Sequence, residues 1–163
     1  MFHRIVVPLD GSSLAEAILP EVQRLAADSP LEVVLLAVGP VPQGIEERDG
    51  QVAYLDDLLA EQEQDLRDYL RGPAHWLNSH RIPVEMRVRF GDPAAEIVRC
   101  AEDEEADAIA MCTHGRTGLD RLIHGSVAGA VLRSTRLPII LCHPTDGAFA
   151  GQHADEAKRL TLV

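Results

Sequence analysis

Strand-like and helix-like segments alternate along most of this 163-residue chain, and the alternation constrains its fold more than any other feature. Short apolar or β-branched runs predict strands at residues 4–9, 31–38, 83–90, 106–111 and 137–142. Amphipathic or capped segments predict helices over residues 13–27, from 52 to about 70, over 93–104 and over 125–133. Five strands that alternate with four helices indicate a single-domain α/β fold, a doubly wound parallel sheet with helices on both faces.

Capping and breaking residues predict where several of these elements begin and end. Ser13-Leu14-Ala15-Glu16 has the spacing of a capping box, so Ser13 is the expected N-cap of the first helix. Asp92 followed by Pro93 is the expected start of the third helix. Gly72-Pro73 should break or kink the second helix. Residues 83–90 alternate apolar and charged side chains, which predicts an edge strand with one polar face.

Charge and cysteine content exclude several classes of protein. A net charge of −11 argues against general binding to DNA or to anionic membranes. No apolar run approaches the roughly 18–20 residues that a membrane-spanning helix needs. Three cysteines without metal-type spacing, and a start that runs directly into a strand pattern, favour a reducing, cytoplasmic location. Cys112 and Cys142 end strands that should be neighbours, but a disulfide between them is not expected there. The acidic run 102–105 is expected to be a solvated helix end.

A Gly-rich run, Met111-Cys112-Thr113-His114-Gly115-Arg116-Thr117-Gly118, lies between the fourth strand and the fourth helix, and Gly125-Ser126 follows it. Glycines and helix N-termini expose backbone N–H groups that can hold an anion. Residues 112–143 contain four arginines and one acid, a net of +3, so the rest of the chain carries −14. In a doubly wound sheet, ligands bind beyond the carboxyl ends of the strands, where this run falls. The sequence therefore predicts a site for a small anionic ligand.

Several stretches resemble the universal stress protein family, small cytosolic α/β proteins of which many bind ATP. The resemblance covers about residues 3–143 and rests on IVVPLDGS at 5–12, LLAV at 35–38, GDPAAEI at 91–97, the Gly-rich run, and GSVA at 125–128 leading to LPII at 137–140. It implies the strand order 3-2-1-4-5 and a nucleotide-binding domain over 1–143, followed by a tail over 144–163 that is either a short helix or disordered. It also implies a homodimer formed through the strand Leu137–Cys142.

The ATP-binding members carry Gly, two residues, Gly, nine residues, then Gly-Ser or Gly-Thr. Gly115 and Gly125-Ser126 match this motif, and Cys112 stands where the first glycine would be, so its side chain could hinder a ligand that packs there. By resemblance, Asp10 would meet the ribose and Val38 would line an adenine pocket. The phosphates of ATP, with or without Mg²⁺, would meet Gly115, Gly125, Ser126 and the Val127 amide, with Arg116 adding positive charge. The other expected site residues are Pro8, Leu9 and Met111.

Other interpretations stay open. Asp10-Gly11-Ser12 is also an ordinary β-to-α turn, and Gly125-Ser126 is also an ordinary helix cap. We expect a stress-response protein that uses an adenine nucleotide as a regulatory ligand with slow or no hydrolysis. Cys112 favours the alternative of a dimeric interaction protein that does not bind nucleotide. An enzyme acting on a phosphoanhydride ranks last, because no general base is identifiable and His114 has no nucleophile partner. We predict no catalytic residue and no metal ligand.

Overall fold

The protein is described by a computed structural model over residues 2–27, 30–41, 51–112 and 127–142. In these ranges five strands form one parallel sheet in the order β3-β2-β1-β4-β5. The strands are β1 (Arg4–Pro8), β2 (Glu32–Gly39), β3 (Val84–Phe90), β4 (Ala108–Cys112) and β5 (Ile139–Cys142). The predicted fold class and strand order are confirmed, and β3 lies at an edge of the sheet as its alternating sequence indicated.

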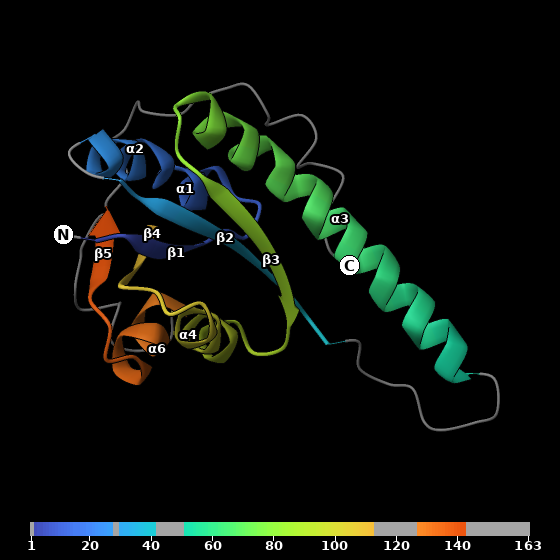
Figure 1. Cartoon of the computed structure of the whole chain (residues 1–163). Helices are drawn as coiled ribbons and strands as arrows, with labels where there is room; N and C mark the ends of the chain where they lie inside the picture. The colour runs from blue at the N-terminus through green and yellow to red at the C-terminus, as the bar shows by residue number, and fades with distance from the viewer. Residues whose placement is uncertain (1, 28–29, 42–50, 113–126, 143–163) are drawn as a thin grey trace.

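Helices cover both faces of the sheet (Figure 1). One face carries α1 (Ser13–Glu16), α2 (Leu19–Ala27) and α3 (Gln51–Ser79), and the other carries α4 (Pro93–Asp103) and α6 (Val127–Ser134). Successive strand side chains point to opposite faces, so Ile5 and Val7 enter the core beneath α2 and α3 while Val6 enters the core beneath α4 and α6. Each face therefore has a filled apolar core of its own.

The first predicted helix, residues 13–27, is two helices in the structure, and this prediction was wrong. Pro20 explains the division, because it has no backbone N–H to donate to the carbonyl of Glu16. The chain turns after Glu16, and α2 begins at Leu19. The N-cap is Ser12 rather than Ser13, since the Ser12 hydroxyl accepts a hydrogen bond of 3.1 Å from the Ala15 N–H. Asp92 caps α4 as predicted, accepting from the Ala95 N–H at 2.9 Å.

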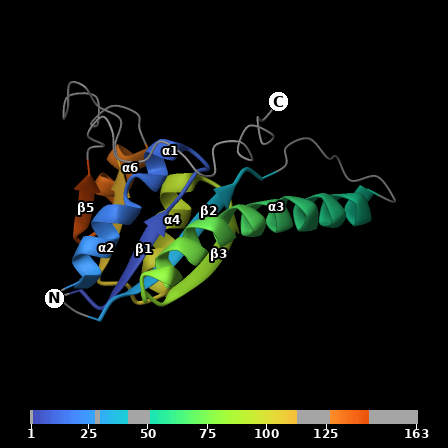
Figure 2. The same ribbon diagram turned by 90° about the horizontal axis from the view of Figure 1, so that it is seen from above.

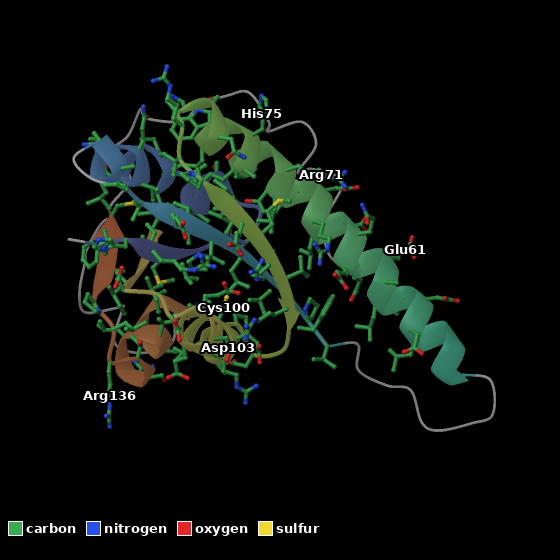
Figure 3. The ribbon with its side chains drawn as sticks, viewed as in Figure 1. Glu61, Arg71, His75, Cys100, Asp103 and Arg136 are labelled. Carbon is green, nitrogen blue, oxygen red and sulfur yellow. A yellow bond between two sulfur atoms is a disulfide. The ribbon has the colours of Figure 1, made fainter. Side chains whose placement is uncertain are left out.

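The second predicted helix does not break at Gly72-Pro73 but continues as α3 to Ser79. Leu70, Ala74 and Leu77 are buried around Pro73, and this packing offsets the hydrogen bond that proline cannot make. With 29 residues, α3 is about 43 Å long, so its amino-terminal half projects beyond the sheet (Figure 2). Glu61, Arg71 and His75 point away from the sheet along α3 (Figure 3).

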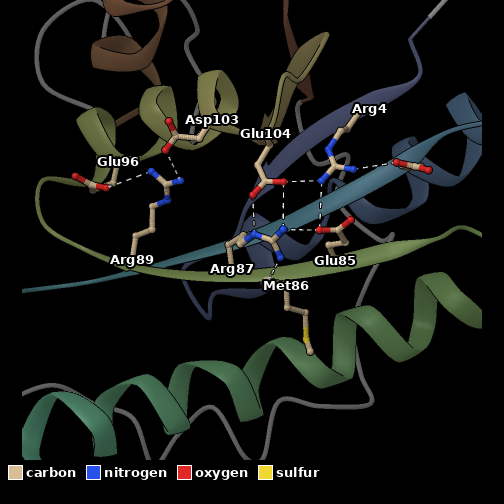
Figure 4. Close-up of polar contacts among 9 residues, drawn as sticks. Arg4, Glu85, Met86, Arg87, Arg89, Glu96, Asp103 and Glu104 are labelled. Atoms are coloured by element: carbon tan, nitrogen blue, oxygen red, sulfur yellow. Dashed lines mark hydrogen bonds and ion pairs between the residues drawn. The ribbon is translucent and has the colours of Figure 1, made fainter.

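The polar face of β3 forms ion pairs with the end of α4 and is only partly exposed to water, which sequence reasoning missed. Arg87 Nε donates to Glu104 Oε1 at 2.6 Å, and Arg4 Nη2 of β1 donates to Glu104 Oε2 at 2.5 Å (Figure 4). The side chain of Glu104 is only 12% exposed, so the acidic run 102–105 is not simply a solvated helix end. Further along the same face, Arg89 of β3 pairs with Asp103 of α4 at 2.7 Å.

Candidate functional site

The strand order brings the carboxyl ends of the central strands β1, β2 and β4 together at one end of the sheet. The chain moves from β1 to β2 on one side and returns to β4 on the other, so the order reverses between β1 and β4. Ligands of doubly wound sheets bind outside the carboxyl ends of the strands at such a switch point. Asp10 follows β1, Val38 lies near the end of β2, and Met111 and Cys112 end β4. The described part of the predicted site is therefore assembled at one location.

The Asp10-Gly11-Ser12 turn holds one exposed carboxylate in a fixed position. Asp10 Oδ1 accepts hydrogen bonds from the Ser12 N–H at 3.0 Å and from the Ser12 hydroxyl at 2.6 Å. Gly11 has φ +82°, a left-handed conformation that side chains rarely adopt, and among the described residues no atom beyond its chain neighbours lies within 4 Å of where a Cβ would be. Oδ1 thus orients the carboxylate, which leaves Oδ2 to accept from a ligand hydroxyl.

Tyr69 lies beneath this turn and was not found from the sequence. Its hydroxyl donates to Glu16 Oε1 at 3.0 Å, which ties α3 to the end of α1. Burial raises the pKa of Tyr69 far above its ordinary value, the neighbouring Glu16 carboxylate adds to this, and a hydrogen bond from the Gly11 backbone opposes it. Tyr69 therefore stays a neutral hydroxyl that steadies the turn. Only its place on the apolar stripe of α3 was visible in the sequence.

The end of β4 presents Met111 and Cys112 to opposite faces of the sheet. Met111 is 7% exposed and packs in the core beneath α4 and α6, whereas Cys112 packs against the core beneath α1 and α2. Cys112 is joined to Cys142 by a disulfide, which corrects the expectation that no such bond forms. The parallel register places the two cysteines directly opposite each other with Cα atoms 4.8 Å apart, inside the range that disulfides span.

The remaining described residues of the predicted site divide into lining and support. Val38 is half-buried and packs against the core beneath α4, and Pro8 is the half-buried last residue of β1. Leu9 is only 4% exposed, and its N–H donates to the Leu36 carbonyl at 2.8 Å, so it supports the site from within the core. Val127 is the first residue of α6 and is 42% exposed. Gly115, Arg116, Gly125 and Ser126 lie outside the described residues.

Within the residues described, no cluster of three or more His, Cys, Asp or Glu side chains has a geometry suited to a metal ion. The same residues include no helix that combines the length and the hydropathy needed to cross a bilayer. Chemically, the site offers the fixed carboxylate of Asp10 as an acceptor and the half-buried side chain of Val38 as an apolar surface. That combination suits recognition of a polyhydroxylated ligand with an apolar ring.

Sequence comparison places this architecture among known proteins. Residues 1–143 match the universal stress protein family. The chain is 30% identical over 159 residues to universal stress protein MJ0577 of Methanocaldococcus jannaschii, covering 86% of this chain and 94% of that one. It is 29% identical over 143 residues to universal stress protein MJ0531 of the same organism, covering 86% and 82% of the two chains.

Solved structures share the fold. That of MJ0577 superposes with a TM-score of 0.73 at 27% identity, covering 90% of this chain and 99% of that one. A universal stress protein in complex with cAMP gives a TM-score of 0.66 at 17% identity, covering 87% and 97%. The universal stress protein from Archaeoglobus fulgidus in complex with dAMP gives a TM-score of 0.59 at 22% identity, covering 85% of this chain and 96% of that one. By its sequence match and its fold, this chain belongs to the universal stress protein family.

Proposed function

We propose that the protein binds ATP or a related adenine nucleotide at the carboxyl ends of β1, β2 and β4. The observation that carries this proposal is the exposed Asp10 carboxylate, which Ser12 fixes at the switch point of the sheet. A ribose offers two vicinal hydroxyl donors, and a fixed carboxylate is a strong acceptor for them. The proteins of this fold solved with cAMP and dAMP support an adenine nucleotide as the ligand class.

The remaining roles follow the family resemblance. Val38 and Met111 would line the adenine pocket, and Pro8 and Leu9 would shape its floor. Backbone N–H groups of Gly115, Gly125, Ser126 and Val127 would hold the phosphates, with Arg116 adding positive charge and Mg²⁺ as an optional companion. The Ser12 hydroxyl at this end of the sheet donates to Asp10 and accepts from the Ala15 N–H, so it serves to fix the turn and to cap α1. We therefore propose that the nucleotide is a regulatory ligand of a cytoplasmic stress response, hydrolysed slowly or not at all.

Isothermal titration with ATP, in the presence and absence of Mg²⁺, tests this proposal. Asp10→Asn keeps an oxygen that can accept from Ser12 but removes the charge, so we expect binding to weaken about tenfold. Glu102→Gln is the matched control, since it removes one exposed carboxylate at a distant helix end and should leave affinity unchanged. No heat at millimolar ATP would overturn the proposal and favour the alternative, a dimeric interaction protein that does not bind nucleotide.

Cys112→Gly restores the glycine of the family motif and tests the alignment of the site. Removing the side chain should leave the affinity for ATP unchanged or raise it, because glycine allows the closest approach of a ligand to the backbone. A clear loss of affinity would contradict the assignment of Cys112 to the first motif position. The measurement compares the variant with the reduced wild-type chain, so that the disulfide does not contribute to the difference.

We also propose that the protein is a homodimer formed through β5. This strand lies at an edge of the described sheet, and Leu141 within it is 38% exposed. An unpaired strand edge offers backbone donors and acceptors that a second copy can satisfy. We propose no nucleic-acid or membrane partner, consistent with the net charge of −11.

A further inference from the structure

Cys112 and Cys142 form a pair because the sheet register holds them together. Strands β4 and β5 are paired from Ile109↔Ile139 to Cys112↔Cys142. Side chains two residues apart on a strand share a face, so both cysteines follow Ala110 and Ile140 onto the side covered by α1 and α2. The ladder therefore fixes the Cα separation of 4.8 Å independently of any bond between the sulfurs.

The pair is accessible, whereas the third cysteine is not. Cys112 and Cys142 are both half-buried at the ends of their strands, while Cys100 is 0% exposed in the core beneath α4. Burial raises the pKa of the Cys100 thiol although the positive charge of Arg89 opposes this, and the thiol therefore stays protonated and unreactive. The chain thus separates two half-buried sulfurs from one fully buried sulfur.

Both redox states of the pair suit their surroundings. Cys142 Sγ lies 3.9 Å from the carbonyl oxygen of Ala17, so a Cys142 thiol can donate a weak hydrogen bond there. A disulfide has no hydrogen to give, and Ala17 then loses this donor. Both faces of the sheet carry apolar cores built mainly from aliphatic side chains, against which Cys112 and Cys142 pack only at the margin, so the fold does not depend on the cross-link as small secreted domains do.

We propose that Cys112 and Cys142 are a reversible thiol–disulfide pair that is oxidised by hydroperoxides. One thiolate attacks a peroxide oxygen, the O–O bond breaks, and water or an alcohol leaves as a sulfenic acid forms on that cysteine. The second thiol attacks the sulfenic sulfur, forming the S–S bond and expelling water. The two sulfurs are oxidised by two electrons and the peroxide is reduced by two. This role goes beyond nucleotide binding and does not require it.

Thiol counting on the full-length chain tests the proposal. After reduction with dithiothreitol and its removal, the denatured chain should show three free thiols. Treatment with stoichiometric hydrogen peroxide should leave one thiol, that of Cys100, with a loss of two hydrogen atoms in the intact mass and a cross-linked peptide containing Cys112 and Cys142. Dithiothreitol should restore all three thiols. Cys100 should react at least about tenfold more slowly than the pair.

Two variants and one spectrum make the result decisive. Cys100→Ser should form the bond as the wild-type chain does, and Cys142→Ser should form no bond within the chain. If Cys142→Ser fails to fold, thiol counting on the wild-type chain still tests whether peroxide joins Cys112 and Cys142. A peroxide-treated chain with three thiols, or one linked to a second chain through Cys112, would overturn the proposal. So would loss of the near-ultraviolet circular dichroism on reduction, because the bond would then be needed for folding.

Discussion

Glu104 is the residue on which most of the polar contacts beneath α4 converge. It accepts from Arg87 and from Arg4, and Glu85 and Glu32 provide further acidic partners for these arginines. Partial burial raises the pKa of Glu104, but the hydrogen bonds from Arg87 and Arg4 outweigh that effect and hold its pKa below the ordinary value. The ionised carboxylate thus links β1 and β3 to the end of α4.

Replacing Glu104 with Gln should destabilise the protein by about 1–2 kcal/mol, since two charge-assisted hydrogen bonds weaken while both arginines keep other acidic partners. Urea unfolding measures the difference, and Glu102→Gln at the exposed neighbouring position should change the free energy of unfolding by less than about 0.5 kcal/mol. If Glu104→Gln and Glu102→Gln lowered the free energy of unfolding equally, the role of Glu104 would be contradicted.

The lowered pKa of Glu104 predicts that its contribution to the stability of the protein depends on pH. Because the folded pKa of Glu104 is lower than that of the unfolded chain, its stabilisation is complete above the unfolded value of about 4.3. It is lost as pH falls through the lower folded pKa. The stability gap between wild type and Glu104→Gln should therefore be full at neutral pH and narrow below pH 4.3. A gap that does not change between neutral and acidic pH would rule out this linkage.

At the scale of the elements, Gly39 and Gly72 each precede a proline, but replacing them with alanine should change the stability of the protein in opposite directions. Gly72 lies inside α3, and no described atom other than those of its chain neighbours is within 4 Å of where a Cβ would be. Gly72→Ala should therefore stabilise the protein, by less than about 1 kcal/mol because the ring of Pro73 opposes a Cβ at the residue before it. Gly39 ends β2, where a Cβ would lie 2.8 Å from Phe90 Cε1, so Gly39→Ala should lower stability. Thermal unfolding measures both, and a stabilising Gly39→Ala would contradict the close packing against Phe90.

The elements also show what the sequence could predict. Alternation predicted which segments are strands and which are helices, because a buried parallel strand and a capped helix each leave a local pattern. The order of the strands in the sheet was implied by the family resemblance. The division at Pro20 and the continuity through Pro73 were missed, because tertiary packing decides whether one proline ends a helix. The sequence placed Asp10 in a turn at the end of the first strand, but it did not predict the contacts of Tyr69 and Glu104. Glu16 lies 53 residues from Tyr69, and Arg4 lies 100 residues from Glu104.

At the scale of the whole molecule, the two edges of the sheet differ in how they are protected. β3 is masked by α3 on one face and by its ion pairs with α4 on the other, and its charged side chains discourage pairing with another strand. β5 has only apolar residues and a cysteine in Ile139–Cys142, with no charged side chain to oppose a partner. If the protein is a dimer, the exposed edge of β5 is therefore the one that a second copy should occupy.

A charge on β5 tests this assembly. Leu141→Lys places an ammonium at an edge position that is 38% exposed, which a free monomer tolerates but an apolar strand-to-strand interface does not. Sedimentation velocity at micromolar concentration should show a dimer for the wild-type chain and a monomer for the variant. Val41→Lys is the matched control, because Val41 is an exposed aliphatic residue next to β2 and should leave the dimer intact. A wild-type chain that sediments only as a monomer, or a Leu141→Lys variant that remains dimeric, would remove β5 as the interface. The result bears on the cysteine pair as well, since Cys142 ends the same strand and an interface there would limit the access of peroxide to its sulfur.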